Sequence, residues 1–395
     1  MNRQAPPAGE ASGKRRICGT LASLLCLLFL CIACAESEES LTRAEHLGPS
    51  LRKALVETLQ ETAVPDAVLG VRFEDGSLWM GAEGLARLGE SPEPMRSDLH
   101  FRMGSITKTF TGTAILMLVG EGVLSLEDKV ETWLPGLIPG GDAITLRMLL
   151  EHSSGLYDFT WSEEGYIDPF LSDLNRVWTP GELVDLAVSE GPLSPPGAVG
   201  VYSNTNTILL GMVLEAASGQ EAECFLEDRI IKPLGLKGTT FPRDAELPPP
   251  YAAGYLDLNG DGVFLPEEET TRQHPSSIWT AGALVSTPGD LLLWLDELLS
   301  GTLLTPELQA ERLAFDRPIE GYPSGRFGLG IALLDGGIGH TGAVPGYQSI
   351  VMRYRQTGFV VWSNGYLTGE GAVNAANRIY AAAVKVVYPD ADPSL

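Results

Sequence analysis

GSITKTFTGTAILMLV, residues 104–119, is a short polar segment that runs into an almost uninterrupted apolar one. Apolar residues occur all round its helical wheel, which predicts a helix buried on most sides. Ser105 and Lys108 are three residues apart at the start of this helix, so the amine can reach the hydroxyl. A serine nucleophile needs a base beside it, and a buried amine with a lowered pKa can serve. In the alternative interpretation, Ser105 caps the helix and Lys108 is solvated.

A second polar segment, GVYSNTN at residues 200–206, precedes another apolar helical run at residues 208–217. Tyr202 can relay protons as a phenol or a phenolate. Asn204 offers both a donor and an acceptor for a substrate amide. A plain capping loop would also explain this segment.

A third segment, GHTGA at residues 339–343, lies between two predicted strands. Its small residues would let a substrate lie against a strand edge. The backbone N–H groups of Ala343 and Ser105 could together form an oxyanion hole. By itself, His340 could be an ordinary histidine at a strand end.

Strand-like patterns occur near both ends of the chain, at residues 67–73, 77–82, 327–334, 347–354 and 359–363. A helix capped by Ser50 precedes them and a helix over residues 372–387 follows them. We therefore expect an α/β (α+β) domain over residues 50–390, with an antiparallel sheet built from both termini and flanked by helices. The sheet lobe comprises residues 50–115 and 275–390, and residues 116–274 form an inserted, mostly helical lobe.

The order Ser-x-x-Lys, Tyr-Ser-Asn, His-Thr-Gly resembles the motif set of the serine β-lactamase and penicillin-binding-protein superfamily. The resemblance is closest to D-alanyl-D-alanine carboxypeptidases related to class C β-lactamases, and it implies the β-lactamase-like fold. It further implies that Ser105 forms an acyl-enzyme, with Lys108 and Tyr202 moving its proton. Asn204 would orient the acyl side chain, and the implied substrate-binding residues on the third segment are His340, Thr341 and Ala343.

One departure from the family pattern leaves the substrate open. Carboxypeptidases of this type place an arginine on the strand before the third motif, and residues 328–334 contain no basic residue. Arg326 or Arg353 would have to replace it. The resemblance thus implies a serine-type carboxypeptidase acting on peptidoglycan stem peptides and acylated by β-lactams. A β-lactamase, an esterase, a D-amino-acid amidase and a non-catalytic wall-binding lipoprotein remain alternatives, and the catalysis needs no cofactor.

The composition excludes other protein classes. The 395 residues are 44% hydrophobic and 20% charged, which excludes a disordered or collagen-like chain. Lys and Arg total 27 against 51 Asp and Glu, a net charge of −24, so we expect no nucleic-acid partner. Cysteines cluster in the first 34 residues and leave only Cys224 beyond them. We expect no disulfide framework and predict that Cys224 is a small apolar residue on a helix.

The N-terminus has the pattern of an export signal. Basic residues 14–16 precede the apolar residues 17–33, which predicts a signal peptide over residues 1–33; an uncleaved membrane anchor is the alternative. Ile32-Ala33-Cys34 resembles a bacterial lipobox, which implies a lipid anchor on Cys34 and a periplasmic or cell-surface location. Residues 34–49 would then be a flexible tether.

A calcium loop is the second candidate site. The sequence DLNGDG from Asp257, followed after five residues by Glu268, fits the pattern of oxygen ligands at alternate positions. The predicted ligands of a structural Ca²⁺ are Asp257, Asn259, Asp261, Val263 and Glu268. An acidic loop held by Asx-turns is the alternative.

Overall fold

The computed structural model describes residues 41–62, 64–368 and 374–393. The predicted signal peptide, Cys34 and the first part of the predicted tether lie outside these residues. No helix in the described ranges is both long enough and apolar enough to cross a bilayer.

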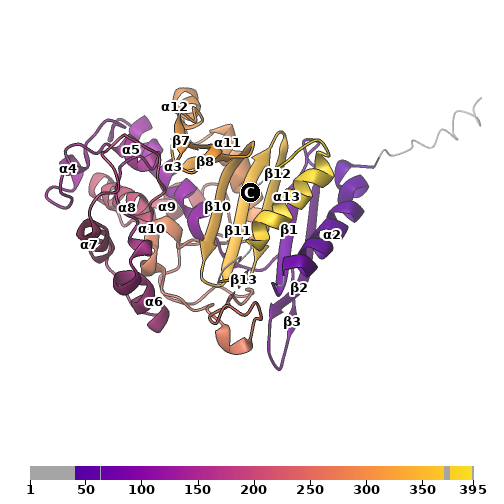
Figure 1. Cartoon of the computed structure of the whole chain (residues 1–395). Helices are drawn as coiled ribbons and strands as arrows, with labels where there is room; N and C mark the ends of the chain where they lie inside the picture. Colours follow the sequence, from indigo (N-terminus) through magenta and orange to yellow (C-terminus); the bar gives the residue numbers. More distant parts are fainter. Residues whose placement is uncertain (1–40, 63, 369–373, 394–395) are drawn as a thin grey trace, which may run out of the picture. The chain divides into compact units, whose positions relative to one another are not determined.

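Strands from the two ends of the chain pair in the middle of one nine-stranded antiparallel sheet, as predicted (Figure 1). Its strands are, in spatial order, β3 (Glu93–Pro94), β2 (Leu78–Arg87), β1 (Asp66–Arg72), β12 (Thr357–Ser363), β11 (Tyr347–Tyr354), β10 (Gly337–Val344), β9 (Ile331–Leu334), β8 (Tyr322–Gly328) and β7 (Arg317–Ile319). The register places Val68 opposite Trp362. Two short pairs lie outside this sheet: β4 (Phe101–Arg102) with β6 (Val285–Ser286), and β5 (Tyr255–Leu256) with β13 (Gly365–Tyr366).

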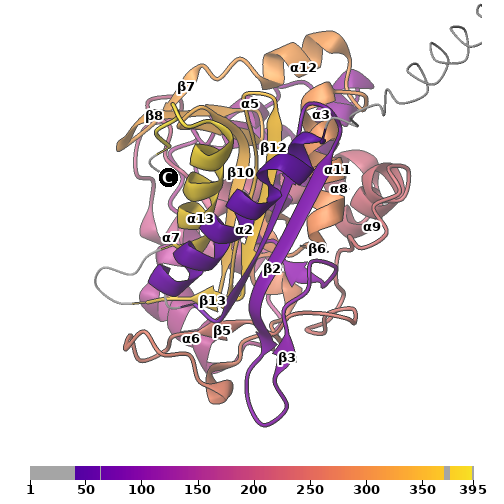
Figure 2. The same cartoon turned by 90° about the vertical axis from the view of Figure 1, so that its right-hand side faces the viewer.

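Helices cover both faces of the sheet, so its central strands β1, β12 and β11 are buried at nearly every position. Helices α2 (Arg43–Thr62) and α13 (Ala375–Val387) lie side by side on one face (Figures 1 and 2). Alternate residues such as Leu69 and Val361 belong to the core on that face. Val68 and Trp362 belong to the opposite core, together with α11 (Pro288–Ser300) and α3 (Thr107–Gly120). The predicted fold class is therefore confirmed.

The middle of the chain forms most of the remaining helices. They are α4 (Val130–Trp133), α5 (Leu146–Leu150), α6 (Asp168–Ser172), α7 (Pro180–Glu190), α8 (Asn204–Ser218) and α9 (Ala222–Leu226), followed later by α10 (Trp279–Gly282) and α12 (Pro306–Arg312). Helix α3 contacts α8, α9 and α10, and residues 107–118 are buried throughout. The prediction of a helix buried on most sides is confirmed.

Several element boundaries differ from the predictions, and the start of α2 is one of them. Helix α2 begins at Arg43 rather than at Ser50, so residues 43–49 of the predicted tether are helical. Its first turn is held from outside, because the Arg43 N–H donates to Asp75 and the Ala44 N–H donates to Ser77. These caps belong to the turn between β1 and β2, which a local pattern cannot reveal.

The predicted strand at residues 327–334 is two strands, β8 and β9, joined by a tight turn. Gly330 in this turn has φ +68°, a conformation that favours glycine. A Cβ at Gly330 would lie 3.0 Å from the Cα of Gly112 on α3. The turn therefore packs directly against α3, and this packing interrupts the strand.

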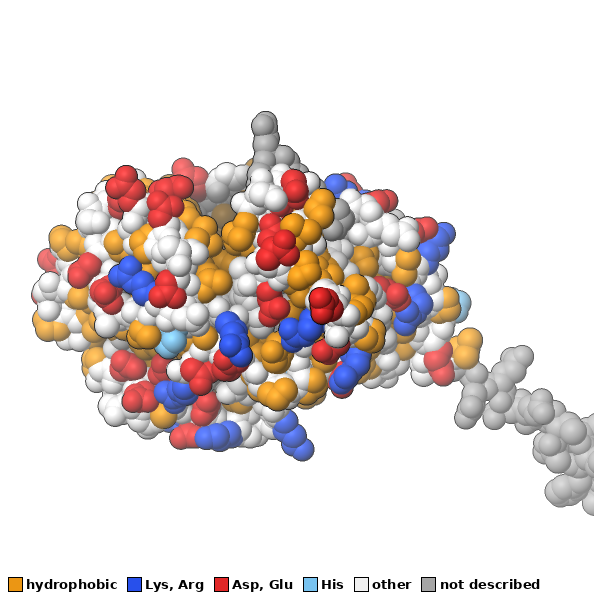
Figure 3. All heavy atoms as spheres, turned by 90° about the horizontal axis from the view of Figure 1, so that it is seen from below, with side chains coloured by type: hydrophobic (Ala, Val, Ile, Leu, Met, Phe, Trp, Pro, Cys, Tyr) orange, Lys and Arg blue, Asp and Glu red, His pale blue; other side chains and the backbone are white. Residues whose placement is uncertain are grey.

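Charges are mixed on the face seen in Figure 3. Lys and Arg side chains are scattered there among Asp, Glu and exposed apolar side chains. This view contains no continuous basic surface of the kind that a nucleic acid would need.

Candidate active site

Ser105 lies in a 3₁₀ turn, Gly104–Ile106, that leads directly into α3. Gly104 has φ +53°, and a Cβ there would lie 2.7 Å from the backbone nitrogen of Ala343. The positive φ and this close approach explain the glycine. They also bring the backbone of the Ser105 turn against β10, as an oxyanion hole made by the N–H groups of Ser105 and Ala343 requires.

Lys108 is buried, with 2% of its surface exposed, and its Nζ lies 3.0 Å from Ser105 Oγ. Nζ also donates to Asn204 Oδ1 and to the carbonyl of Ala281, each at 2.7 Å. Burial lowers the pKa of Lys108 to about 7, while the charge of Asp158 opposes the shift. A neutral amine can satisfy both acceptors with its two hydrogens and keep its lone pair for the Ser105 hydroxyl.

Tyr202 contacts Ser105 from the other side. Its hydroxyl donates to Ser105 Oγ at 2.6 Å, and its ring stacks on His152 with centroids 4.7 Å apart. Burial raises the pKa of Tyr202 above its ordinary value. The structure therefore favours the phenol over the phenolate and leaves Lys108 as the basic group.

Asn204 is the first residue of α8 rather than part of a loop. Its Nδ2 donates to Asp158 at 2.8 Å, and the same carboxylate oxygen accepts the Asn204 N–H at 3.0 Å. These bonds fix the amide so that Oδ1 faces Lys108. Asp158 is buried, and it was not predicted because the segment around it matches no motif.

His340 lies within strand β10, not between two strands as predicted. Its Nδ1 is 2.5 Å from the carbonyl of Thr341, so Nδ1 carries a hydrogen and the neutral ring offers Nε2 as an acceptor. Burial, with the charge of Lys108, lowers the pKa of His340 to about 4. His340 is therefore neutral near neutral pH and offers a substrate no positive charge there. Thr341 is half-buried and Ala343 is exposed.

His152 supports the site without touching Ser105. Its Nδ1 lies 3.2 Å from the N–H of Ser203 and 3.2 Å from Asn206 Nδ2, which makes Nδ1 an acceptor. Burial lowers the pKa of His152 well below its ordinary value. Together with its stacking on Tyr202, these contacts give His152 a positioning role.

A cavity of about 440 Å³ opens beside Ser105. Asn204 and Ala343 also line it, so the nucleophile and the proposed oxyanion donor face the same space. No Lys or Arg is among the described residues that line it. Arg326 donates to the carbonyls of Pro323 and Gly325, and Arg353 pairs with Asp296. The structure thus places neither predicted arginine on the cavity wall.

The predicted calcium ligands are engaged by backbone N–H groups. Asp257 accepts from Asp261 and Gly262, Asp261 accepts from Val263, and Asn259 also accepts from Asp261. Glu268 accepts from Leu258 and Leu265. Across the described parts of the chain, no three or more His, Cys, Asp or Glu side chains are grouped to hold a metal ion. These contacts are those of the alternative, a loop held by Asx-turns, and a structural Ca²⁺ stays a prediction from the sequence.

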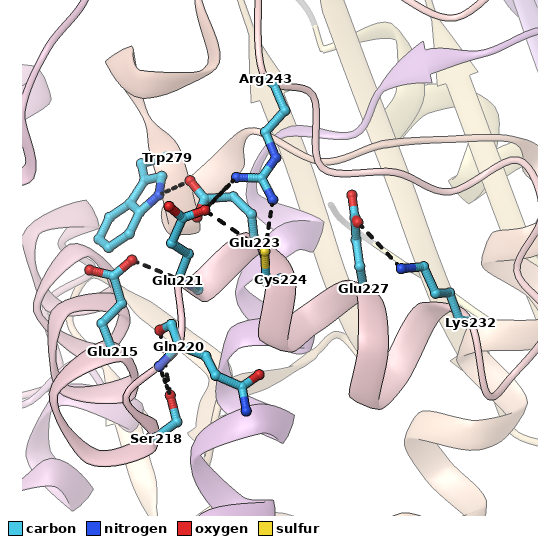
Figure 4. A network of polar contacts seen from close by, with 11 residues as sticks. Glu215, Ser218, Gln220, Glu221, Glu223, Cys224, Glu227, Lys232, Arg243 and Trp279 are labelled. Carbon is cyan, nitrogen blue, oxygen red and sulfur yellow. Dashed lines mark hydrogen bonds and ion pairs between the residues drawn. The ribbon is translucent and has the colours of Figure 1, made fainter.

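Cys224 lies on α9 as predicted but is not an apolar packing residue. Its Sγ lies 3.2 Å from Arg243 Nη2, and Arg243 also pairs with Glu221 (Figure 4). Trp279 donates to Glu223 in the same network. Cys224 is half-buried and a free thiol.

Comparison with known proteins identifies the family. The model of the Beta-lactamase family matches residues 51–383. The chain belongs to the Beta-lactamase family. Residues 51–383 are therefore a serine-hydrolase domain of this family, and the superfamily resemblance of the three motifs is confirmed.

Three similar proteins of this superfamily illustrate the range of its members. Penicillin-binding protein 4* of Bacillus subtilis (strain 168) is 30% identical over 292 residues, which are 69% of this chain but only 61% of that protein. The structure of a D-stereospecific amidohydrolase from Streptomyces sp. is 32% identical, has a TM-score of 0.75 and matches 85% of this chain and 97% of that one. The structure of D-amino acid amidase from Ochrobactrum anthropi SV3, complexed with L-phenylalanine amide, is 26% identical and has a TM-score of 0.77. It matches 87% of this chain and 99% of that one.

Proposed function

We propose that this protein is an exported serine acyl hydrolase that cleaves small amides and esters whose leaving group carries no carboxylate. The convergence of Lys108 and Tyr202 on the Ser105 hydroxyl carries the proposal of an acylating catalyst. The absence of Lys and Arg among the described residues that line the cavity supports the choice of leaving group. Export, and lipidation of Cys34, stay predictions from residues 1–34.

In the proposed reaction, the Ser105 hydroxyl gives its proton to the Lys108 lone pair as Oγ bonds to the substrate carbonyl carbon. The N–H groups of Ser105 and Ala343 hold the oxyanion. The carbon–nitrogen or carbon–oxygen bond then breaks as the leaving atom takes the proton held by Lys108, relayed through the Tyr202 hydroxyl, so that both side chains return to their starting states. A water molecule then gives one proton to Lys108 as its oxygen bonds to the acyl carbon. The bond from that carbon to Ser105 Oγ breaks, Oγ takes the proton back from Lys108, and the free acid leaves.

A D-alanyl-D-alanine carboxypeptidase is the second candidate, favoured by the motif resemblance and by the penicillin-binding relative. This candidate needs a group that binds the free carboxylate of the substrate. His340 does not supply a cation near neutral pH because its pKa is about 4. β-Lactams remain proposed acylating ligands, and stem peptides proposed substrates, under this candidate.

Two substrates that differ only in the leaving group test the choice. We expect D-Ala-D-Ala-NH₂ to be cleaved between its two residues with a kcat/KM at least about tenfold above that of D-Ala-D-Ala, since an unpaired buried charge forfeits a charged hydrogen bond. Ser105→Ala is the control for contaminating activity. A preference for the free carboxylate would favour the carboxypeptidase. Two results would refute the acylating catalyst. One is that neither peptide nor an activated ester is cleaved, and the other is that cleavage persists in Ser105→Ala.

The pH profile tests the assignment of the base. The kcat/KM should rise with pH through about 7, as Lys108 in the free enzyme loses its proton,. His340 should add no step between pH 6 and 7, because it is already neutral there. His340→Gln should therefore leave the midpoint of the rise unchanged. A midpoint that moves with this substitution would contradict the assignment.

A further inference from the structure

The cavity beside Ser105 offers hydrogen-bond acceptors from several side chains whose own hydrogens are already used. Thr160 donates to Asp158, and Tyr166 donates to the carbonyl of Ser277. Ser277 donates to the carbonyl of His274, and Thr368 to that of Asp257. A hydroxyl has one hydrogen to donate. These four wall residues therefore present only lone pairs to a ligand.

Gln273 is a fixed acceptor on the same wall. It is 4% exposed, and its Nε2 donates to the carbonyls of Thr270 at 2.8 Å and Pro345 at 2.7 Å. Both amide hydrogens are thus used, and these bonds prevent the amide from flipping. Within the described residues, Oε1 has no hydrogen-bond donor. The atom that Gln273 can offer to a ligand is therefore a carbonyl oxygen.

The rest of the cavity suits a large apolar group. Apolar side chains around it include Ile167, Phe170, Leu171, Ile278 and Val344. Among the described residues that line the cavity there is no Lys or Arg. An acceptor oxygen next to an apolar wall of this kind matches a ligand that has a charged N–H donor close to an apolar side chain.

We propose that the substrates are aminoacyl amides or esters with a free α-ammonium group and a large apolar side chain, and that Gln273 Oε1 accepts a hydrogen bond from the ammonium. Gln273 is then a specificity-determining residue. This proposal rests on the proposed function and names its substrate class. Under this proposal N-acylated peptides are poor substrates, because they lack the ammonium group.

The test uses two chromogenic substrates, the p-nitroanilides of D-phenylalanine and of 3-phenylpropionic acid, which differ only in the amine. The ratio of their kcat/KM values measures recognition of the amine. In the wild-type protein we expect a higher kcat/KM for the D-phenylalanine substrate, which carries the amine. In Gln273→Met we expect the ratio of the two kcat/KM values to fall about tenfold. The kcat/KM for 3-phenylpropionyl p-nitroanilide should change far less.

Gln309→Met is the matched control. Gln309 is also buried, and its Nε2 also donates to two carbonyls, of Leu298 and Leu299, but it lies on α12 away from the cavity. We expect this variant to keep the wild-type ratio. If Gln273→Met slows both substrates equally, Gln273 has only a structural role and the proposal is overturned.

Two further outcomes separate this proposal from the proposed function. Cleavage of the dipeptide amide or of 3-phenylpropionyl p-nitroanilide, without preference for the amine, would overturn the ammonium site and leave the acyl hydrolase standing. Absence of turnover with every amide and ester would refute both.

Discussion

Ser105→Ala should lower kcat/KM for amide and ester substrates by roughly 10⁵-fold to 10⁶-fold, the scale of loss when a catalytic serine is removed. The reason is geometric, because Lys108 Nζ and the Tyr202 hydroxyl both contact Ser105 Oγ. Without that oxygen no acyl-enzyme forms. Initial rates and mass spectrometry of the protein incubated with an activated ester measure the two effects.

Ser218→Ala, on the far end of α8, is a control that should keep wild-type rates. A fluorescent penicillin gives a second measurement: any label seen on the wild type should be absent from Ser105→Ala. An acylated Ser105→Ala protein would mean that another residue is the nucleophile.

Lys108→Met should lower kcat/KM by about 10²-fold to 10⁴-fold, the usual contribution of a general base. Methionine fills a similar volume but cannot accept the Ser105 proton. The rise of kcat/KM through pH 7 should disappear with it, because the group that titrates there is gone. Rates measured from pH 5 to 9 test both expectations.

Lys237→Met is the control for loss of a lysine, since Lys237 is exposed and should leave the profile unchanged. A Lys108→Met protein that retains the rise through pH 7 would assign the base to a different group.

The sequence identified most of the site because its residues belong to three short motifs. Helix α3 was predictable, since its apolar residues occur all round the wheel and burial follows. Asp158 was not predictable, because its importance comes from a long-range contact with Asn204. The neutral state of His340 was not predictable either, because burial and the nearby Lys108 lower its pKa.

The fold was predictable in class but less so in its boundaries. The strand-like pattern at residues 347–354 indicated β11 with its correct ends. The start of α2 depends on Asp75 and Ser77, which approach it only after the β1–β2 hairpin forms. The break between β8 and β9 depends on α3, which lies against Gly330. Tertiary contacts decide such boundaries, so local patterns miss them.

The pairing of β1 with β12 has a consequence for biosynthesis. Strand β1 is synthesised first, but it gains its second neighbour only after β12, one of the last strands, has been made. Pairing between strands so far apart in the sequence slows folding and leaves the nascent chain incompletely folded. Strand β10, which supplies Ala343, is also made late. We therefore expect a partly synthesised polypeptide to contain Ser105 and Lys108 without any assembled catalytic centre.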